Sequence, residues 1–383
     1  INNGNGFDPN ISNQRNMGTA TTTTEVNLVS KDFKIPQVLR FNMAADFRIP
    51  GGINVTLEGM LSKTLNNIVY SDINISGASG TIDPTLSGGA DIRPSYAGQR
   101  VSRDFTNVIL LDNSSSGYTY SLTTQVSKSF NFGLDLMAAY THGQSRSLND
   151  GTSSTAMSNW EFVQIVNNPN NPELSRSTFD IRHRVIGSLG YKVSYGRHKA
   201  FSTGFSLFYA GTSGSPFTYL YNGDLNGDGA RSNDLIYVPL NASEINLVPI
   251  TGSNPISVAD QWAALDAFIE QDEYLRTRRG QYAERNGAST PWENRFDLRI
   301  SQDLGINIKD RVHKFQLTLD IFNVGNLINK DWGRSYFVAN NAYQLITYTG
   351  RGYTFRAPSD NKAYNVSDLA SRWQGQFGIR YIF

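Results

Sequence analysis

Apolar and polar residues alternate one by one through many segments of this chain, and that alternation restricts the fold more than any other feature. Between Leu39 and Ile49, apolar side chains fall at odd positions, while Arg40, Asp46 and Arg48 fall at even positions. A two-residue period places successive side chains on opposite faces of a β-strand. The chain is therefore expected to be all-β, with a sheet that has one apolar face and one polar face.

The same alternation recurs in about nine segments. They lie near residues 39–49, 53–62, 118–126, 134–140, 179–193, 201–209, 296–300, 315–321 and 373–383. A tilted strand crosses a bilayer in about 9–11 residues, whereas a membrane helix needs an apolar run of roughly 18 residues or more, and no run here approaches that length. Membrane helices are thus excluded, and a transmembrane β-barrel is not.

The connections between these segments alternate between short and long. Short turns lie at 50–52, near Asn131, at 195–199 and at 308–314, and long segments lie at 71–117, 143–178, 211–293 and 327–371. Outer-membrane barrels have short periplasmic turns and long extracellular loops. Structureless loops of this length are uncommon in compact soluble domains. The pattern favours a barrel over a secreted soluble β-protein, although the charges alone fit both.

The composition excludes several classes of function. Lys and Arg number 34 against 33 Asp and Glu, and a net charge of +1 argues against a nucleic-acid partner. The chain has no cysteine and four scattered histidines, with no zinc-binding histidine pair, nucleophile elbow or phosphate loop. Enzymatic activity is therefore not expected. Aromatic residues make up 12% of the chain and occur near strand ends, which favours a membrane interface.

Charged residues of both signs recur on the polar faces of the strands. In a barrel they would line a wet lumen or pack against a plug. The residues predicted to do so are Arg40, Asp46, Glu58, Arg182, Arg184, Asp297, Arg299, Asp320 and Arg380.

One loop has part of a calcium-binding pattern. Asp224, Asn226 and Asp228, followed by Gly229, match positions 1, 3, 5 and 6 of an EF-hand loop, where oxygen ligands converge on one point. The closing glutamate is missing, and Asp234 falls one residue before its position. The loop therefore predicts either a Ca²⁺ site that stiffens an extracellular loop or an Asx-rich turn, and no other cofactor is expected.

The longest connection, residues 212–292, is predicted to be an extracellular loop with a helical segment near 257–286. Trp262, Leu265 and Phe268 fall at helical spacing there. The basic and aromatic residues at 274–279 suit contact with substrate or lipopolysaccharide, or packing as a lid over neighbouring loops.

Six stretches in a fixed order carry a resemblance to a known family. They are DFKIPQV (32–38), NVILL (107–111), NPELSRS (171–177), NDLIYVP (233–239), RGQYAERN (279–286) and FQLTLDIFNVGN (315–326). From about residue 32 onward the chain resembles the C-terminal barrel portion of TonB-dependent outer-membrane receptors of the Oar-like kind found in Bacteroidota. The alternating last strand, which ends at Phe383, resembles the closing strand of bacterial outer-membrane proteins.

The resemblance implies that residues 1–383 are the C-terminal part of a 22-stranded antiparallel β-barrel in the bacterial outer membrane. An odd number of spanning strands fits a part of a larger barrel, since single-chain barrels normally have an even number. The expected partners are outer-membrane lipid and lipopolysaccharide, the remaining strands and an N-terminal plug from the same protein or another chain, the TonB complex, and an unknown transported nutrient.

The sequence departs from the family pattern because no plug, TonB box or early strands are found in it. Active uptake is the first expectation from the resemblance. The alternative is a barrel scaffold or surface adhesin that binds partners through its long loops.

Overall fold

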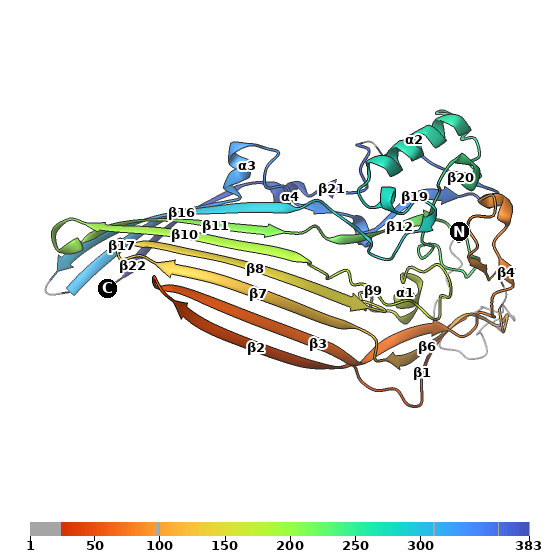
Figure 1. Cartoon of the computed structure of the whole chain (residues 1–383), viewed down its shortest axis with the longest axis horizontal. Helices are drawn as coiled ribbons and strands as arrows, with labels where there is room; N and C mark the ends of the chain where they lie inside the picture. Colours follow the sequence, from red (N-terminus) through yellow and green to blue (C-terminus); the bar gives the residue numbers. More distant parts are fainter. Residues whose placement is uncertain (1–23, 97, 99, 309–310, 359, 383) are drawn as a thin grey trace, which may run out of the picture.

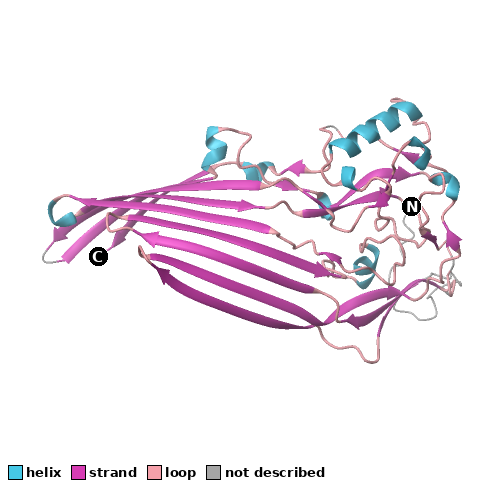
Figure 2. Cartoon of the chain, viewed as in Figure 1, coloured by secondary structure: helices cyan, strands magenta, loops and turns pink. Residues whose placement is uncertain are grey.

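The structure is a computed structural model of the chain, and it describes residues 24–96, 98, 100–308, 311–358 and 360–382. Strands dominate it, and the helices are short (Figure 2). Among the described residues, no helix is both long enough and apolar enough to cross a bilayer.

Nine long strands lie side by side in one antiparallel wall, and they correspond to the nine segments in which the sequence alternates (Figure 1). In spatial order they are β2 (Gln37–Ile49), β3 (Ile53–Asp72), β7 (Tyr118–Ser129), β8 (Leu134–Ser147), β10 (His183–Tyr195), β11 (Phe201–Thr212), β16 (Glu293–Ile308), β17 (Arg311–Phe322) and β22 (Gln374–Ile382). The predicted all-β class is confirmed.

The apolar side chains of the wall share one face, and in the described part of the chain no second layer of protein covers them. Leu189 in the middle of the wall is directly opposite Leu136 on one neighbouring strand and Leu207 on the other. The three side chains are 41%, 38% and 36% exposed. In a soluble β-sandwich such side chains would be buried against a second sheet. A continuous band of exposed apolar residues instead suits contact with the hydrocarbon of a membrane.

Two strands form the edges of the wall. Among the described strands, β2, of 13 residues, pairs with β3 alone, and β22, of 9 residues, pairs with β17 alone. In the described part of the chain no pairing joins β2 to β22. Unpaired N–H and C=O groups on long edges are not tolerated in hydrocarbon, because each costs several kcal/mol.

The sheet continues beyond the wall in a part that the sequence did not predict. Strand β6 (Phe105–Ser114) pairs with the last residues of β3, and β1 (Thr24–Val29) runs parallel to β6. Residues 105–114 fall inside the expected long loop 71–117. The continuous apolar run at 108–111 does not alternate and so carries no period-two signal.

The short turns lie at one end of the wall and the long connections at the other (Figure 1). The turn between β2 and β3 uses Gly51 and Gly52 at φ values of 89° and 70°, which other residues rarely adopt. The short turn expected at 308–314 includes residues 309–310, which lie outside the described residues.

The four long connections, 73–117, 148–182, 213–292 and 323–373, fold together into one body, here called the cap. Strand β12 (Pro216–Asn222) of the third connection pairs in parallel with β19 (Ala342–Tyr348) of the fourth. Around this pair lies a hydrophobic core that includes Leu86 from the first connection, Phe268 from the third and Phe355 from the fourth. Trp160 of the second connection packs with Ile109 and Ala230. The segments that the sequence predicted to be loops therefore share a hydrophobic core of their own.

Short elements complete the cap. The short strands are β4 (Gly80–Thr81), β5 (Pro94–Ser95), β9 (Ser175–Arg176), β13 (Tyr237–Val238), β14 (Gln281–Tyr282), β15 (Ala288–Ser289), β18 (Tyr336–Phe337), β20 (Tyr353–Thr354) and β21 (Asn365–Val366). The helices are α1 (Ala156–Glu161), α2 (Val258–Gln271), α3 (Val324–Ile328) and α4 (Asp368–Ser371).

Three predicted segments extend past the ends of the elements that the structure has. The helix expected near 257–286 is α2, which begins after Ser257, whose hydroxyl accepts a hydrogen bond from the Asp260 N–H. It ends at Gln271 because Asp272 is extended, and the rest of the range holds a 3₁₀ turn at 275–277 and β14. Residues 179–182 precede β10, and residue 373 precedes β22.

Candidate functional site

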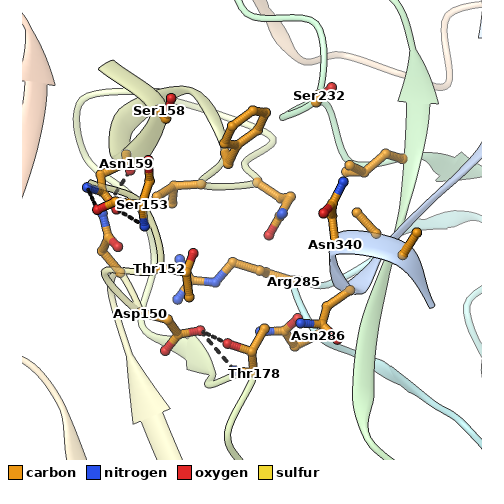
Figure 3. Close-up of a pocket in the computed structure, with 18 of the residues that line it drawn as sticks. Asp150, Thr152, Ser153, Ser158, Asn159, Thr178, Ser232, Arg285, Asn286 and Asn340 are labelled. Carbon is orange, nitrogen blue, oxygen red and sulfur yellow. Dashed lines mark hydrogen bonds between the residues drawn. The ribbon is translucent and has the colours of Figure 1, made fainter. Parts of the chain in front are cut away.

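A polar pocket of about 710 Å³ lies in the cap, and three of the four long connections line it (Figure 3). The second connection contributes residues 149–164 around α1 together with Thr178, the third contributes Ser232, Arg285 and Asn286, and the fourth contributes residues 339–344 at the start of β19. Most of the lining side chains are uncharged and polar. The pocket exists only because connections that are far apart in sequence pack together.

Asp150 fixes one wall of this pocket. Its carboxylate accepts hydrogen bonds from the hydroxyls of Ser147 at 2.5 Å and Ser177 at 2.7 Å, and from the N–H and hydroxyl of Thr178 at 2.8 and 2.7 Å. Burial acts to raise the pKa of Asp150, but these hydrogen bonds outweigh it and hold that pKa below its usual range. The carboxylate therefore joins the end of β8 to the segment before β10.

Arg285 lies across the pocket floor and is 5% exposed. Its guanidinium donates hydrogen bonds to the backbone carbonyls of Ser147 and Leu148, and its Nε has no partner among the described residues. Burial lowers the pKa of Arg285, and the charge of Asp150 offsets a part of that effect. An arginine remains charged even so.

Asn286 anchors the same segment from the other side. Its backbone is left-handed at φ 56°, a conformation that asparagine tolerates better than most residues. Its N–H donates to the hydroxyl of Thr218 at 2.8 Å, and its Nδ2 donates to the carbonyl of Arg176 at 2.7 Å. Arg285 is thereby held in place by residues of the second and third connections.

Other polar groups of the pocket remain available to a ligand. Within the described residues, the side chains of Thr152, Gln164 and Asn340 line the pocket without a hydrogen bond to protein. Phe162 lies beside them and is 51% exposed. A few free donors and acceptors beside an aromatic ring, in a pocket of this size, are the usual features of a site that binds a small molecule.

The nine charged residues predicted to line a lumen are on one face of the wall. Cross-strand register links them, because directly opposed residues share a face. Glu58 is opposite Thr123, Thr123 opposite Thr141, and Thr141 opposite Arg184. The same face continues through Asp297, Arg299, Asp320 and Arg380 and, on the other side, through Arg40 and Asp46. Arg182 precedes β10 by one residue and follows the same alternation.

Five of these nine residues have partners inside the chain. Arg299 pairs with Asp320 at 3.2 Å, Arg182 with Asp180 at 3.3 Å and Asp297 with Arg295 at 3.0 Å, while Asp46 accepts from the Thr56 hydroxyl at 2.6 Å.

The remaining four are unpartnered in the part of the chain that the structure describes. They are Arg40, Glu58, Arg184 and Arg380.

The four residues predicted to bind Ca²⁺ lie close together in the cap. Asp224 accepts from the N–H groups of Gly227 and Gly229 at 2.7 and 2.9 Å, and the Asn226 Nδ2 donates to Asp228 at 3.1 Å. Asp234 is committed elsewhere, since Arg93 occupies one of its oxygens and the N–H of Leu225 the other. The described residues contain no cluster of three or more His, Cys, Asp and Glu side chains suited to a metal.

Sequence reasoning did not single out the pocket residues. Arg285 and Asn286 lie at the end of the stretch 279–286, one of the six that carry the family resemblance, which was the only signal for them. Thr152, Gln164 and Asn340 sit in segments rich in Asn, Ser and Thr that have no motif.

The family described as "Outer membrane beta barrel domain" matches residues 1–352 of the chain. No curated protein matches it.

Proposed function

The chain belongs to the outer membrane β-barrel domain family and lies in the bacterial outer membrane, and from this premise we propose that it is part of a TonB-dependent transporter. The protein takes up a nutrient that is too large for porins, with energy from the TonB complex. It acts by binding and translocation, and it catalyses no reaction.

The polar pocket in the cap is the observation that carries this proposal. A transporter of this kind must first bind its substrate at the cell surface, and the cap contains a pocket of about 710 Å³. The free polar side chains at the pocket are uncharged, whereas Asp150 and Arg285 already have hydrogen-bond partners within the cap. We therefore expect a neutral, hydroxyl-rich molecule, whose hydrogen bonds would be made by Thr152, Gln164 and Asn340 and whose apolar face would stack on Phe162.

The polar face of the wall supports the presence of a plug. Arg40, Glu58, Arg184 and Arg380 have no partner among the described residues, although they face the same side. A plug domain of the same protein or of another chain would supply the missing hydrogen bonds and opposite charges.

The edges of the wall support the presence of further strands. Backbone groups along the outer sides of β2 and β22 need partners inside a membrane. Additional strands that pair with both edges, up to the 22 of the related receptors, would close the barrel.

A surface scaffold or adhesin is the second candidate function. The observation that favours it is the hydrophobic core of the cap, because a folded body rather than mobile loops can present a fixed binding surface. Such a protein would need neither TonB nor a pocket.

The test is uptake by cells that express the protein. Cells are given a defined mixture of neutral oligosaccharides, and the loss of each from the medium is followed by mass spectrometry. We expect wild-type cells to deplete at least one oligosaccharide, and expect depletion to stop when a protonophore collapses the proton gradient or when the tonB gene is deleted.

A matched pair of variants connects uptake to the pocket. Thr152→Trp fills the pocket from an exposed position, and Ser154→Trp places the same bulk two residues away, outside the lining. We expect the first to abolish depletion and the second to preserve it. Uptake that continues without TonB would overturn the proposal. Cells that express the protein and attach to a surface but deplete no oligosaccharide would favour the adhesin.

A further inference from the structure

The loop at residues 224–234 has several buried side chains in the cap and is held from several sides. Asn226, Asp228 and Asn233 are each no more than 1% exposed. The N–H of Tyr96 in the first connection donates to the carbonyl of Asn226 at 2.7 Å. Arg93, also in the first connection, pairs with Asp234 at 3.2 Å. The loop therefore joins the first and third connections, in a part of the cap where water has little access.

The carboxylate of Asp228 lacks a compensating positive charge. Asp234 pairs with Arg93 and Asp72 pairs with Arg100, but no basic group of the described residues lies within ion-pair distance of Asp224 or Asp228. Among the described residues the oxygens of Asp228 accept hydrogen bonds from neutral donors alone, namely the N–H of Ala230 at 2.8 Å and the side-chain amides of Asn226 and Asn233 at 3.1 and 2.7 Å. An uncompensated buried carboxylate is costly, and a bound cation is one way in which proteins remove that cost.

A second observation in the same loop points to a ligand, namely a buried oxygen without a donor. The Nδ2 of Asn233 donates to Asp228 at 2.7 Å, so the side-chain amide is directed at this carboxylate. Its Oδ1 has no hydrogen-bond partner among the described residues, although the side chain is almost fully buried. Rotation of the amide by 180° about its last torsion exchanges nitrogen and oxygen, and would turn the oxygen toward Asp228. A cation between the two groups would satisfy both.

We propose that Asp224, Asn226, Asp228 and Asn233 bind one Ca²⁺ ion. The four side chains present carboxylate and amide oxygens, the ligands that Ca²⁺ prefers, and the first three have the spacing of an EF-hand loop. Ca²⁺ takes six to eight oxygens, so water and backbone carbonyls complete the set. A transition metal is disfavoured because the four side chains supply oxygen ligands and neither an imidazole nor a thiolate.

Asp234 has a different role from the one that the sequence suggested. Unlike Asp224 and Asp228, it has a basic partner among the described residues: one of its oxygens pairs with Arg93, and the other accepts from the N–H groups of Leu225 and Asn226 at 2.8 and 3.4 Å. It positions the start of the loop against the first connection. Asn233, one residue earlier, takes its place among the proposed ligands.

The test measures Ca²⁺ binding and thermal unfolding of the protein purified in detergent and freed of divalent cations. We expect calorimetric titration with CaCl₂ to give one site per chain, and expect the melting temperature to be higher in Ca²⁺ than in EDTA. Asp228→Asn should weaken Ca²⁺ binding at least about tenfold, because a charged ligand is lost. In EDTA this variant should melt above the wild type, because the buried charge is gone.

The Asn233→Asp variant distinguishes a loop that binds a cation from an Asx-rich turn that binds none. With Ca²⁺ bound, the added carboxylate becomes a charged ligand, so we expect tighter Ca²⁺ binding and a larger difference between Ca²⁺ and EDTA. In a turn that binds no ion, the substitution removes a donor to Asp228 and adds repulsion, so it would lower the melting temperature equally in Ca²⁺ and in EDTA.

The matched control is Asp266→Asn, which removes an exposed carboxylate from α2 of the same connection. Its Ca²⁺ affinity should equal that of the wild type. The proposal is overturned if the wild type shows no Ca²⁺ binding, if Asp228→Asn binds as the wild type does, or if Asn233→Asp gains no affinity.

Discussion

At the scale of single residues, the cap is held by buried polar groups whose partners come from distant parts of the chain. Asp150 contacts Ser177 and Thr178, 27 and 28 residues later, and Arg285 contacts the carbonyl of Leu148, 137 residues earlier. A buried polar group that loses its partner costs about 1–3 kcal/mol. These contacts therefore specify which connections pack together, in addition to stabilising the cap.

Because the hydrogen bonds of Asp150 favour its ionised carboxylate, we expect the segments that it joins to open in acid. Its folded-state pKa lies below the usual value of about 3.9. The stability that it contributes is therefore complete above the unfolded pKa and is lost as the pH falls through the folded pKa. We expect hydrogen exchange of residues 147–151 and 177–178, corrected for intrinsic pH dependence, to accelerate below about pH 4. In the Asp150→Asn variant, this acceleration of hydrogen exchange at low pH should disappear. If it persists, another group controls the opening.

At the scale of the elements, each strand of the wall has a lipid-facing and a lumen-facing side, and register carries this division across all nine strands. Exposed apolar residues are directly opposite one another, as Phe41 and Leu61 are, or Leu319 and Phe377. A slip of one residue in any strand would reverse its two faces. The alternation of apolar and polar residues therefore determines the register between strands as well as the positions of the strands.

Arginine substitutions at neighbouring positions of β10 test the assignment of the two faces. Leu189→Arg places a charge in the middle of the apolar face and should destabilise the folded protein by about 2–4 kcal/mol, as expected near a bilayer midplane. Ser188→Arg places it on the polar face and should change the free energy of unfolding by less than about 1 kcal/mol. Urea titration in phospholipid vesicles measures both. Equal costs for the two variants would contradict the assignment.

At the scale of the whole molecule, the wall and the cap are stabilised by different means. Within the residues that the structure describes, the wall has no core on its apolar face, so it depends on backbone pairing and on lipid. The cap instead buries aromatic and aliphatic side chains such as Tyr219, Phe268 and Tyr353. The cap thus resembles a small soluble domain attached to one end of a membrane wall.

Epitope insertions at two glycines test the orientation of the protein in the membrane. Gly252 lies in the cap, Gly51 lies in the turn between β2 and β3, and an added Cβ at either would meet no atom within 4 Å. We expect antibody to label intact cells with the tag at Gly252, and to label cells with the tag at Gly51 only after the outer membrane is permeabilised. The opposite result would place the cap in the periplasm.

The sequence by itself determined the nine strands, their faces and the positions of the short turns. These features are local, because alternation and turn residues act within a few positions of one another. The sequence also brought together Asp224, Asn226 and Asp228, whose spacing alone makes them neighbours. Only the tertiary structure decided that the long connections share a core, that β12 pairs with β19, that Asp234 pairs with Arg93, and that Arg285 meets Leu148. Contacts between residues more than a hundred positions apart depend on the packing of several connections at once, and no local pattern in the sequence records that.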